Sequence, residues 1–504
     1  MKYLILTTLV FALVSPQSHA QNSTTSNSPH HYKVRIDAQK NRAHVEADIQ
    51  LEGNQLSLFN VNPMPGFPNG QADFLENILV TNKSGETIKL INKGEGDFEL
   101  ASAGNQAIHL SYEVRLEHDK LNWPAGNEEV LYHTDEGIMM TGYALFLVPA
   151  EKMSGDTQVD FILPNGWLAN TAMQTLQHPP TASDSTVTTS FIAHSRRELV
   201  NNAMFFGSAK STQLQAGGIQ LSIVLGKRYW PQRQLFEDLL RQQLKSYLPM
   251  FGAKPLAARY LIIINQGDTG DGGAFSGSFS QFLRADAELR TRPIWGRVLA
   301  HELLHFWNGL SLVPENDQEE WFKEGVTDYL TIVSMSQNRL ISHAHVQQWL
   351  ENLSRGQMVA RRAQGIQESV RDAAKNKHQN WLLVYGGGSI AGLALDIELR
   401  RASADKIGLS QLMQVLYRDF ALQGKKYQLK DIALAAQQLT GKDFYPLLRN
   451  LVENKQAVEL SPIFAAIGLQ LEQYLLLEHS LLKNPQASAI EKARFKAIFG
   501  FGFE

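Results

Sequence analysis

The chain of 504 residues contains no cysteine, so disulfide bonds cannot stabilise it and its stability has to come from the size of its hydrophobic core. Charged residues are also few, at 19%, and the formal net charge is only -3. That balance gives no support to binding of nucleic acid through charge. Hydrophobic residues make up 43%, which is ordinary for a globular protein, and the length predicts two or three domains.

Long apolar runs are missing beyond the N-terminus, so no membrane-spanning segment is expected. Residues 1–20 resemble a signal peptide: Lys2 is the positive end, residues 3–14 are a short apolar core, and Ser18-His19-Ala20 is a cleavage site. Residues 21–29 are polar and predict a disordered leader. The short signal is typical of bacterial export to the periplasm, and secretion beyond it stays open.

His301, Glu302 and His305 form the sequence H-E-x-x-H. On a helix, residues i and i+4 share a face, so both imidazoles can bind one ion while Glu302 flanks it as a general base. A catalytic zinc ion needs a third protein ligand and an open position. Glu324, separated from His305 by eighteen residues, is the candidate. These ligand types favour Zn²⁺ over other divalent ions.

The neighbours of this motif argue against a surface helix that carries these residues by chance. The segments 294–307 and 319–330 are rich in large apolar residues, so both are expected to be buried. Buried imidazoles and carboxylates must be paired or must hold a metal ion. Asp328 follows Glu324 by one helical turn and is expected to accept a hydrogen bond from a ligand histidine, which would fix its tautomer.

The motif and its continuation, residues 301–308 and 321–329, resemble the gluzincin peptidases, and most of all the glycyl aminopeptidase family. The likeness extends over roughly residues 30–460. It implies a thermolysin-like α+β catalytic domain, one zinc ion and a peptide or protein substrate. Larger members of the family carry a PDZ-type domain, and the C-terminal tail of this chain is too short for a complete one.

The segment 384–389 resembles the family's tyrosine segment, although family members usually carry a lysine where this chain has Gly387. The resemblance implies that Tyr385 donates a hydrogen bond to the oxyanion of the reaction. A neutral phenol suits that task near pH 7. The alternative for Tyr385 is a packed aromatic residue before a glycine turn.

Hydrophobic periodicity divides the chain into four parts after the leader. Residues 30–226 alternate in the manner of short strands and predict an antiparallel β-sandwich. Residues 227–345 are expected to form the zinc peptidase domain, and 346–460 a helical domain that completes the cleft. Residues 461–504 form a C-terminal tail. The predicted fold is therefore multidomain, and the oligomeric state is not determined by the sequence.

The glycine-rich stretch 267–277 is the expected strand edge for substrate pairing, at Gly272-Gly273-Ala274-Phe275-Ser276. Related aminopeptidases place a glutamate just after such glycines to bind the free amine of the substrate. This chain has no carboxylate after those glycines until Asp286, and Asp268 and Asp271 before them are more typical of turns. Aminopeptidase activity is favoured over endopeptidase activity, but this departure leaves the question open.

Two other functions remain open from the sequence. One is a non-catalytic periplasmic binding protein that retains the fold and the metal, which the intact Glu302 argues against. The other is a zinc hydrolase of non-peptide substrates, because the same site can activate water against other electrophiles. A zinc-dependent metallopeptidase that uses a metal-activated water is the leading hypothesis.

Overall fold

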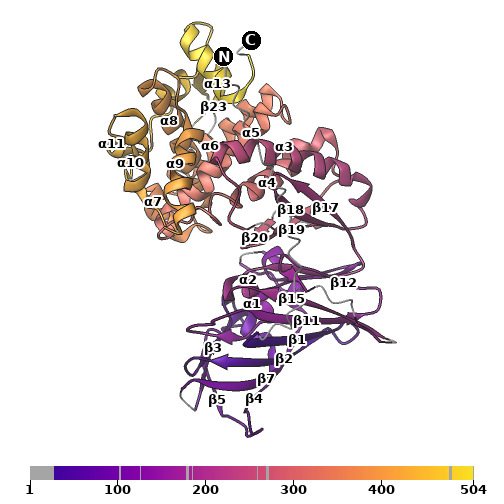
Figure 1. Cartoon of the computed structure of the whole chain (residues 1–504). Helices are drawn as coiled ribbons and strands as arrows, with labels where there is room; N and C mark the ends of the chain where they lie inside the picture. The colour runs from indigo at the N-terminus through magenta and orange to yellow at the C-terminus, as the bar shows by residue number, and fades with distance from the viewer. Residues whose placement is uncertain are drawn as a thin grey trace, which may run out of the picture.

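A computed structural model of the chain describes residues 28–101, 104–124, 126–176, 181–183, 185–257, 259–267, 272–475 and 479–502 (Figure 1). The predicted signal peptide and most of the predicted leader lie outside these ranges, as do Asp268 and Asp271.

The N-terminal unit is rich in β-strands and contains one large sheet and two smaller ones. In β2, buried Val45 and Ala47 alternate with exposed Glu46 and Asp48, as expected for a strand with one face in the core. The strand pairs of these sheets are antiparallel except for β1 with β11. The large sheet contains β1 (His30–Asp37), β2 (Arg42–Leu51), β4 (Leu75–Asn82), β7 (Gln106–Arg115), β11 (Thr157–Pro164), β13 (Gln174–Thr175), β14 (Thr181–Ala182) and β15 (Thr186–Ala193).

Both smaller sheets of this unit have four strands and pack into the same hydrophobic core as the large sheet. One contains β3 (Gln55–Ser57), β5 (Leu90–Gly94), β6 (Asp97–Leu100) and β10 (Val148–Pro149). The other contains β8 (Leu131–Thr134), β9 (Gly137–Thr141), β12 (Leu168–Asn170) and β16 (Ala203–Gly207). The unit also has the short helices α1 (Gly142–Leu145), α2 (Arg196–Val200), η1 (Gly70–Phe74), η2 (His118–Lys120) and η3 (Asn127–Glu129).

A five-stranded sheet lies between two hydrophobic cores. In its central strand, Leu261 and Ile263 pack into the N-terminal core, whereas Ile262 and Ile264 pack against the helices. Burial on both faces explains why this strand is a continuous apolar run. The strands, in spatial order, are β17 (Lys210–Ala216), β18 (Ile219–Leu225), β19 (Arg259–Gln266), β21 (Ser278–Leu283) and β20 (Gly272–Ala274).

The first two strands of this sheet, β17 and β18, fall inside the range 30–226 that was predicted for the N-terminal domain. Strand β17 pairs with β18, and β18 pairs with β19, so the division of sheets lies near residue 209. A local pattern shows that a segment is a strand but not which sheet it joins, because pairing depends on residues far away in the chain.

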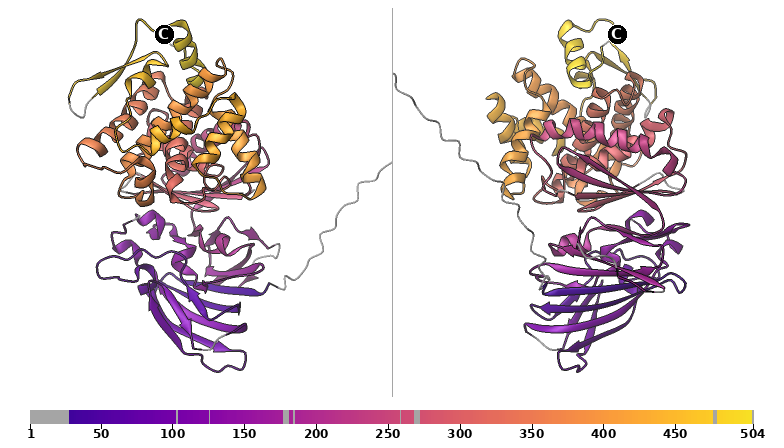
Figure 2. Two further views of the ribbon diagram at one scale, coloured as in Figure 1. Left: turned by 90° about the vertical axis from the view of Figure 1, so that its left-hand side faces the viewer. Right: turned by 45° about the vertical axis from the view of Figure 1, so that its right-hand side comes forward.

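The helices cover the other face of the five-stranded sheet (Figure 2). Their buried side chains belong to one continuous hydrophobic core. The predicted ranges 227–345 and 346–460 and the tail are therefore not separated by their packing. The elements are α3 (Arg233–Phe251), α4 (Arg292–His305), α5 (Val326–Gln337), α6 (His343–Arg362), α7 (Val370–Ala373), α8 (Trp381–Ala402), α9 (Leu409–Asp419), α10 (Leu429–Thr440), α11 (Tyr445–Val452), α12 (Ser461–Ala465), β22 (Leu469–Gln473), β23 (His479–Lys483) and α13 (Ala489–Phe499).

Short 3-10 segments join these helices, and one π-helical segment, η7 (Trp321–Gly325), runs directly into α5. The 3-10 segments are η4 (Trp230–Gln232), η5 (Leu289–Thr291), η6 (Asp317–Glu319), η8 (Ala374–Asn376) and η9 (Ala421–Gln423).

Helix α8 is the one helix of the described residues that is long and apolar enough to cross a membrane, and most of it is buried inside the protein. Its glycines do not form a turn, as the alternative for Tyr385 supposed, but lie within the helix. A Cβ atom on Gly388 would lie 2.3 Å from the carbonyl oxygen of Trp321, and one on Gly325 would lie 2.5 Å from Gly388. These glycines let α8 and η7 pack backbone against backbone.

Candidate metal and catalytic site

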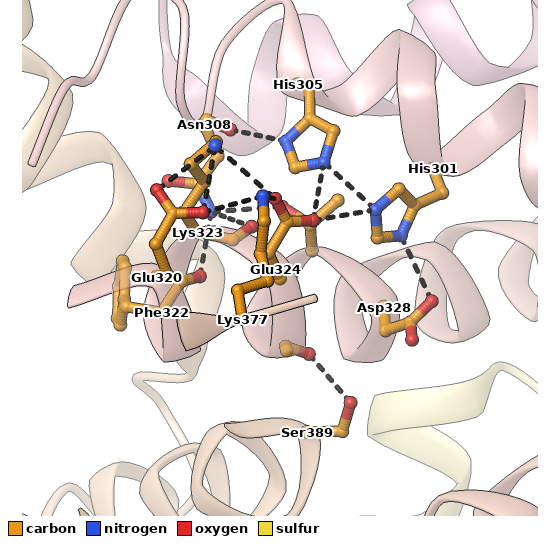
Figure 3. Close-up of polar contacts among 12 residues, drawn as sticks. His301, His305, Asn308, Glu320, Phe322, Lys323, Glu324, Asp328, Lys377 and Ser389 are labelled. Atoms are coloured by element: carbon orange, nitrogen blue, oxygen red, sulfur yellow. Dashed lines mark hydrogen bonds and ion pairs between the residues drawn. The ribbon is translucent and has the colours of Figure 1, made fainter. Parts of the chain in front are cut away.

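Helix α4 and the π-helical segment η7 bring the predicted ligands together (Figure 3). Nε2 of His301 lies 2.9 Å from Nε2 of His305, and Oε2 of Glu324 lies 3.1 Å from the His305 nitrogen and 3.4 Å from the His301 nitrogen. All three side chains are buried. The H-E-x-x-H spacing and the helix after it thus place three ligand atoms around one point.

Each imidazole donates a hydrogen bond through Nδ1, the ring nitrogen that does not face the other ligands. Nδ1 of His301 donates to Oδ1 of Asp328 at 3.0 Å, and Nδ1 of His305 donates to the backbone oxygen of Asn308 at 2.9 Å. Because these acceptors place the proton on Nδ1, the Nε2 atoms turn lone pairs toward each other and toward Glu324.

The geometry of these atoms fits zinc. Tetrahedral coordination at zinc–nitrogen distances near 2.0–2.1 Å separates ligand atoms by about 3.3 Å. Three lone-pair donors 2.9–3.4 Å apart would repel one another unless they share a cation. His301, His305 and Glu324 are therefore the residues that would hold the ion.

The second carboxylate oxygen of Glu324 is bound by lysines. Nζ of Lys377 lies 2.7 Å from Oε1, and Nζ of Lys323 lies 3.3 Å from it, while Glu320 contacts both ammonium groups. Burial raises the pKa of Glu324, but Lys377, His305 and Lys323 outweigh it and hold that pKa well below its usual value. Glu324 is thus ionised, and only Oε2 faces the imidazoles.

Negative charge dominates the surroundings of His301. Burial lowers its pKa, but Asp328 and Glu324 outweigh this and raise the pKa to about 10. Asp328 itself receives a hydrogen bond from Nη2 of Arg297 at 2.9 Å, and its pKa is lowered although burial opposes this. The same field that favours a proton on the imidazole would favour a divalent cation beside it.

Glu302 lies beside the two imidazoles, with its carboxylate within 4.8 Å of a ring nitrogen of each. Glu302 lines the cleft and, among the described residues, forms no ion pair with either histidine, unlike Glu324. Desolvation raises the pKa of Glu302 despite the nearby histidines. A carboxylate whose pKa is moved toward neutrality is suited to accept and return a proton.

Tyr385 lies near the start of α8, and its ring is roughly parallel to the imidazole of His301 at 6.1 Å between centroids. Burial, together with Glu324 and Glu302, raises the pKa of the phenol well above its ordinary value. The hydroxyl therefore stays protonated at neutral pH and can donate a hydrogen bond.

These residues lie in a cleft of about 960 Å³ between the helices and the N-terminal unit. One wall carries the predicted site, and the other is formed by loops and α2 of the N-terminal unit. Strand β20 is an edge strand of its sheet, and Gly272, Ala274 and Phe275 of the predicted segment 272–276 line the cleft. Asp286 does not line it and pairs with Arg228 instead.

Glu129 is a cleft carboxylate that sequence reasoning missed. It belongs to η3, which packs against β20, and it lines the cleft beside the glycines. No local pattern marks it, because it lies far from the motif in sequence and reaches the cleft only through the docking of the two units. Lys377 was missed for the same reason.

Asn308 was also missed, although it is part of the segment that resembles the glycyl aminopeptidases. Its backbone oxygen accepts from His305, and its Nδ2 donates to the backbone oxygen of Phe322 and to Oγ1 of Thr327. Asn308 therefore ties the end of α4 to the π-helical segment and to α5, and this holds the three ligand residues in register.

Comparison with known proteins agrees with this architecture. A family model described as the Peptidase M61 N-terminal domain matches residues 31–208. The structure of an aminopeptidase N family protein from Idiomarina loihiensis superimposes with a TM-score of 0.73 at 18% identity, over 88% of this chain and 79% of that chain. An M1 zinc metallopeptidase from Deinococcus radiodurans superimposes with a TM-score of 0.58 at 13% identity, over 86% of this chain and 94% of that chain.

The chain has a zinc-metallopeptidase-like fold. A β-rich N-terminal unit followed by a helical C-terminal region matches those structures, which confirms the predicted fold class. A search of curated protein sequences finds no match to the chain.

Proposed function

We propose that this chain is a zinc-dependent peptidase and that it acts as an aminopeptidase. The observation that supports this most is the convergence of two Nε2 lone pairs and one carboxylate oxygen within 3.4 Å of one another, beside a carboxylate that is not part of the set. That arrangement suits hydrolysis rather than a purely structural metal site, because the carboxylate of Glu302 lies next to the ligands and can act as a base.

A zinc ion bound there would lend Lewis acidity to a scissile carbonyl and to a water molecule. Glu302 takes a proton from that water as it attacks, and passes it to the nitrogen of the leaving amine. The hydroxyl of Tyr385 donates to the carbonyl oxygen as negative charge develops on it. Asp328 keeps the proton on Nδ1 of His301, so that Nε2 stays available to the cation.

Peptide binding is assigned to the outer side of β20, the last strand in the order of its sheet. An edge strand offers unpaired backbone N–H and C=O groups with which an extended peptide can pair. Glu129 belongs to η3, which packs against this strand, and it brings to the cleft a carboxylate that the sequence after the glycines lacks. We assign Glu129 to the free amine of the substrate, which is the basis for preferring aminopeptidase activity.

The test is metal analysis combined with hydrolysis of matched peptides whose amino termini are either free or acetylated. We expect one zinc ion per chain, loss of hydrolysis on chelation, recovery with zinc, and cleavage of free-amine peptides alone. Equal cleavage of acetylated peptides would show an endopeptidase. No cleavage by the zinc-loaded protein would leave a binding protein or a hydrolase of non-peptide substrates.

We also propose export of the chain to the periplasm or beyond, with cleavage after Ala20. The support is the signal-like composition of residues 1–20. N-terminal sequencing of the protein purified from the periplasmic fraction of an expressing bacterium is expected to begin at Gln21. A mature protein that retains residues 1–20 would contradict this.

A further inference from the structure

Arg197 is a cation of the cleft that forms no ion pair with any of the described residues. It belongs to α2 of the N-terminal unit, is exposed, and lines the cleft. Its Nε donates to Oγ of Ser276 at 2.7 Å, and Nδ2 of Asn201 donates to the same oxygen at 2.9 Å. The guanidinium is thereby held at the end of the peptide-binding edge, because Ser276 follows β20 by two residues.

The other cleft arginine and the cleft lysines are each paired with a carboxylate. Arg297 contacts Asp328 at 2.9 Å, and Lys377 contacts Glu324 at 2.7 Å. Lys323 contacts Glu320 at 3.0 Å.

Among the residues that the structure describes, no carboxylate lies within 4.0 Å of the Arg197 guanidinium. Desolvation lowers the pKa of Arg197, and no carboxylate offsets it. The hydrogen-bond partner of this guanidinium, Ser276, is neutral. The remaining N–H groups of such a guanidinium can bind a carboxylate in bidentate fashion, so it is suited to recognise an anion.

We propose that Arg197 is a specificity residue that binds the side-chain carboxylate of an acidic residue in the peptide substrate. The inference rests on the proposed peptidase function and names the substrate class for the same cleft. Ser276 lies just after the glycines of β20, where the resemblance to the glycyl aminopeptidases implies a carboxylate that binds the substrate amine. In this chain Ser276 instead accepts a hydrogen bond from the guanidinium of Arg197. Glu129 and Arg197 then offer the substrate one site for an amine and one for a carboxylate.

The experiment uses the full mature chain and fluorogenic peptides that differ at one position, Glu or Gln, scanned along the peptide. We expect kcat/KM to favour Glu over Gln by about tenfold at one position. The preference is expected to disappear in Arg197→Met. The Arg197→Glu variant is expected to prefer peptides with Lys at that position.

The matched control is Arg196→Met. Arg196 is the preceding residue in α2, but its guanidinium donates to Oγ of Ser57, lies over the ring of Phe59 and does not line the cleft. This variant is expected to keep both the rate and the preference. Equal rates for Glu and Gln peptides at every position, or a preference that survives in Arg197→Met, would overturn the proposal.

Binding separates this proposal from the proposed function. Dissociation constants of the Glu and Gln peptides are measured by calorimetry on Glu302→Gln protein, with and without Arg197→Met. If the wild-type chain cleaves no peptide but the Glu peptide binds about tenfold more tightly through Arg197, the subsite stands and the peptidase function fails. Equal dissociation constants would remove the subsite even if hydrolysis is observed.

Discussion

The two walls of the cleft are built differently. On the helical wall, Glu324 contacts two imidazoles and two lysines, and each imidazole has a second acceptor behind it. On the N-terminal wall, Glu129 and Arg197 lie on helices of only three and five residues. The helical wall fixes the positions of the metal ligands and of the base. Substitutions on the N-terminal wall are expected to alter substrate recognition with little effect on the metal ligands.

The largest expected effect is on the helical wall. Glu302→Gln removes the base but keeps its size, so peptide hydrolysis is expected to fall by about a hundredfold to ten-thousandfold. Zinc content and the unfolding midpoint are expected to stay unchanged, because Glu302 is not one of the assigned ligands. The control is Glu86→Gln in an exposed turn of the N-terminal unit. A Glu302→Gln protein that retains full activity would disprove the assigned role.

Loss of Asp328 tests whether the network behind the ligands matters. Asp328→Asn weakens the hydrogen bond from His301 and leaves Arg297 without its carboxylate. Zinc affinity is expected to fall by about tenfold to a hundredfold, measured by competition with a chelating dye. Asp238→Asn, on the exposed side of α3, is the control. Unchanged affinity would mean that the histidines are oriented by packing alone.

Acid is expected to destabilise the N-terminal unit through His118. His118 is buried, neither ring nitrogen has a hydrogen-bond partner among the described residues, and desolvation lowers its pKa to about 3 from 6.5. Below pH 6.5 the unfolded chain binds a proton that the folded chain refuses, so stability falls as the pH drops toward 3. The cost at pH 5 is about 2 kcal/mol relative to pH 7.

Urea unfolding at pH 7 and pH 5 measures this effect in the wild type and in His118→Phe. The substituted ring remains among Phe74 and Trp123, which contact His118 in the native protein. In the variant, the difference in free energy of unfolding between pH 7 and pH 5 is expected to be smaller by about 2 kcal/mol than in the wild type. An equal pH dependence in both proteins would show that other groups carry it.

The smallest effect is expected at Glu129. Glu129→Gln keeps the size of the side chain but removes the charge that we assign to the free amine. KM for free-amine peptides is expected to rise by about tenfold with little change in kcat or in zinc content. Glu86→Gln, in the exposed turn of the N-terminal unit, serves as the control. A fall in zinc content would instead place Glu129 in the support of the metal site.

The sequence predicted local elements closely where periodicity was strong. The helix expected to carry His301 and His305 is α4, and the strand-like range 30–226 contains β1 to β18. It did not predict that β17 and β18 join the sheet of β19, or that the regions 227–345 and 346–460 share a core. Periodicity reports which face of an element is buried, whereas pairing and docking are decided by distant residues.

By itself, the sequence determined which side chains can bind one cation, because the separation of His301 and His305 on a helix is a local property of the chain. It also carried the motif around Glu324. Only the tertiary structure decided that Lys377 binds the second oxygen of that carboxylate, and that Glu129 and Arg197 face the same cleft from the other unit. Those contacts join residues far apart in the chain, and they exist only after both cores have packed against the five-stranded sheet.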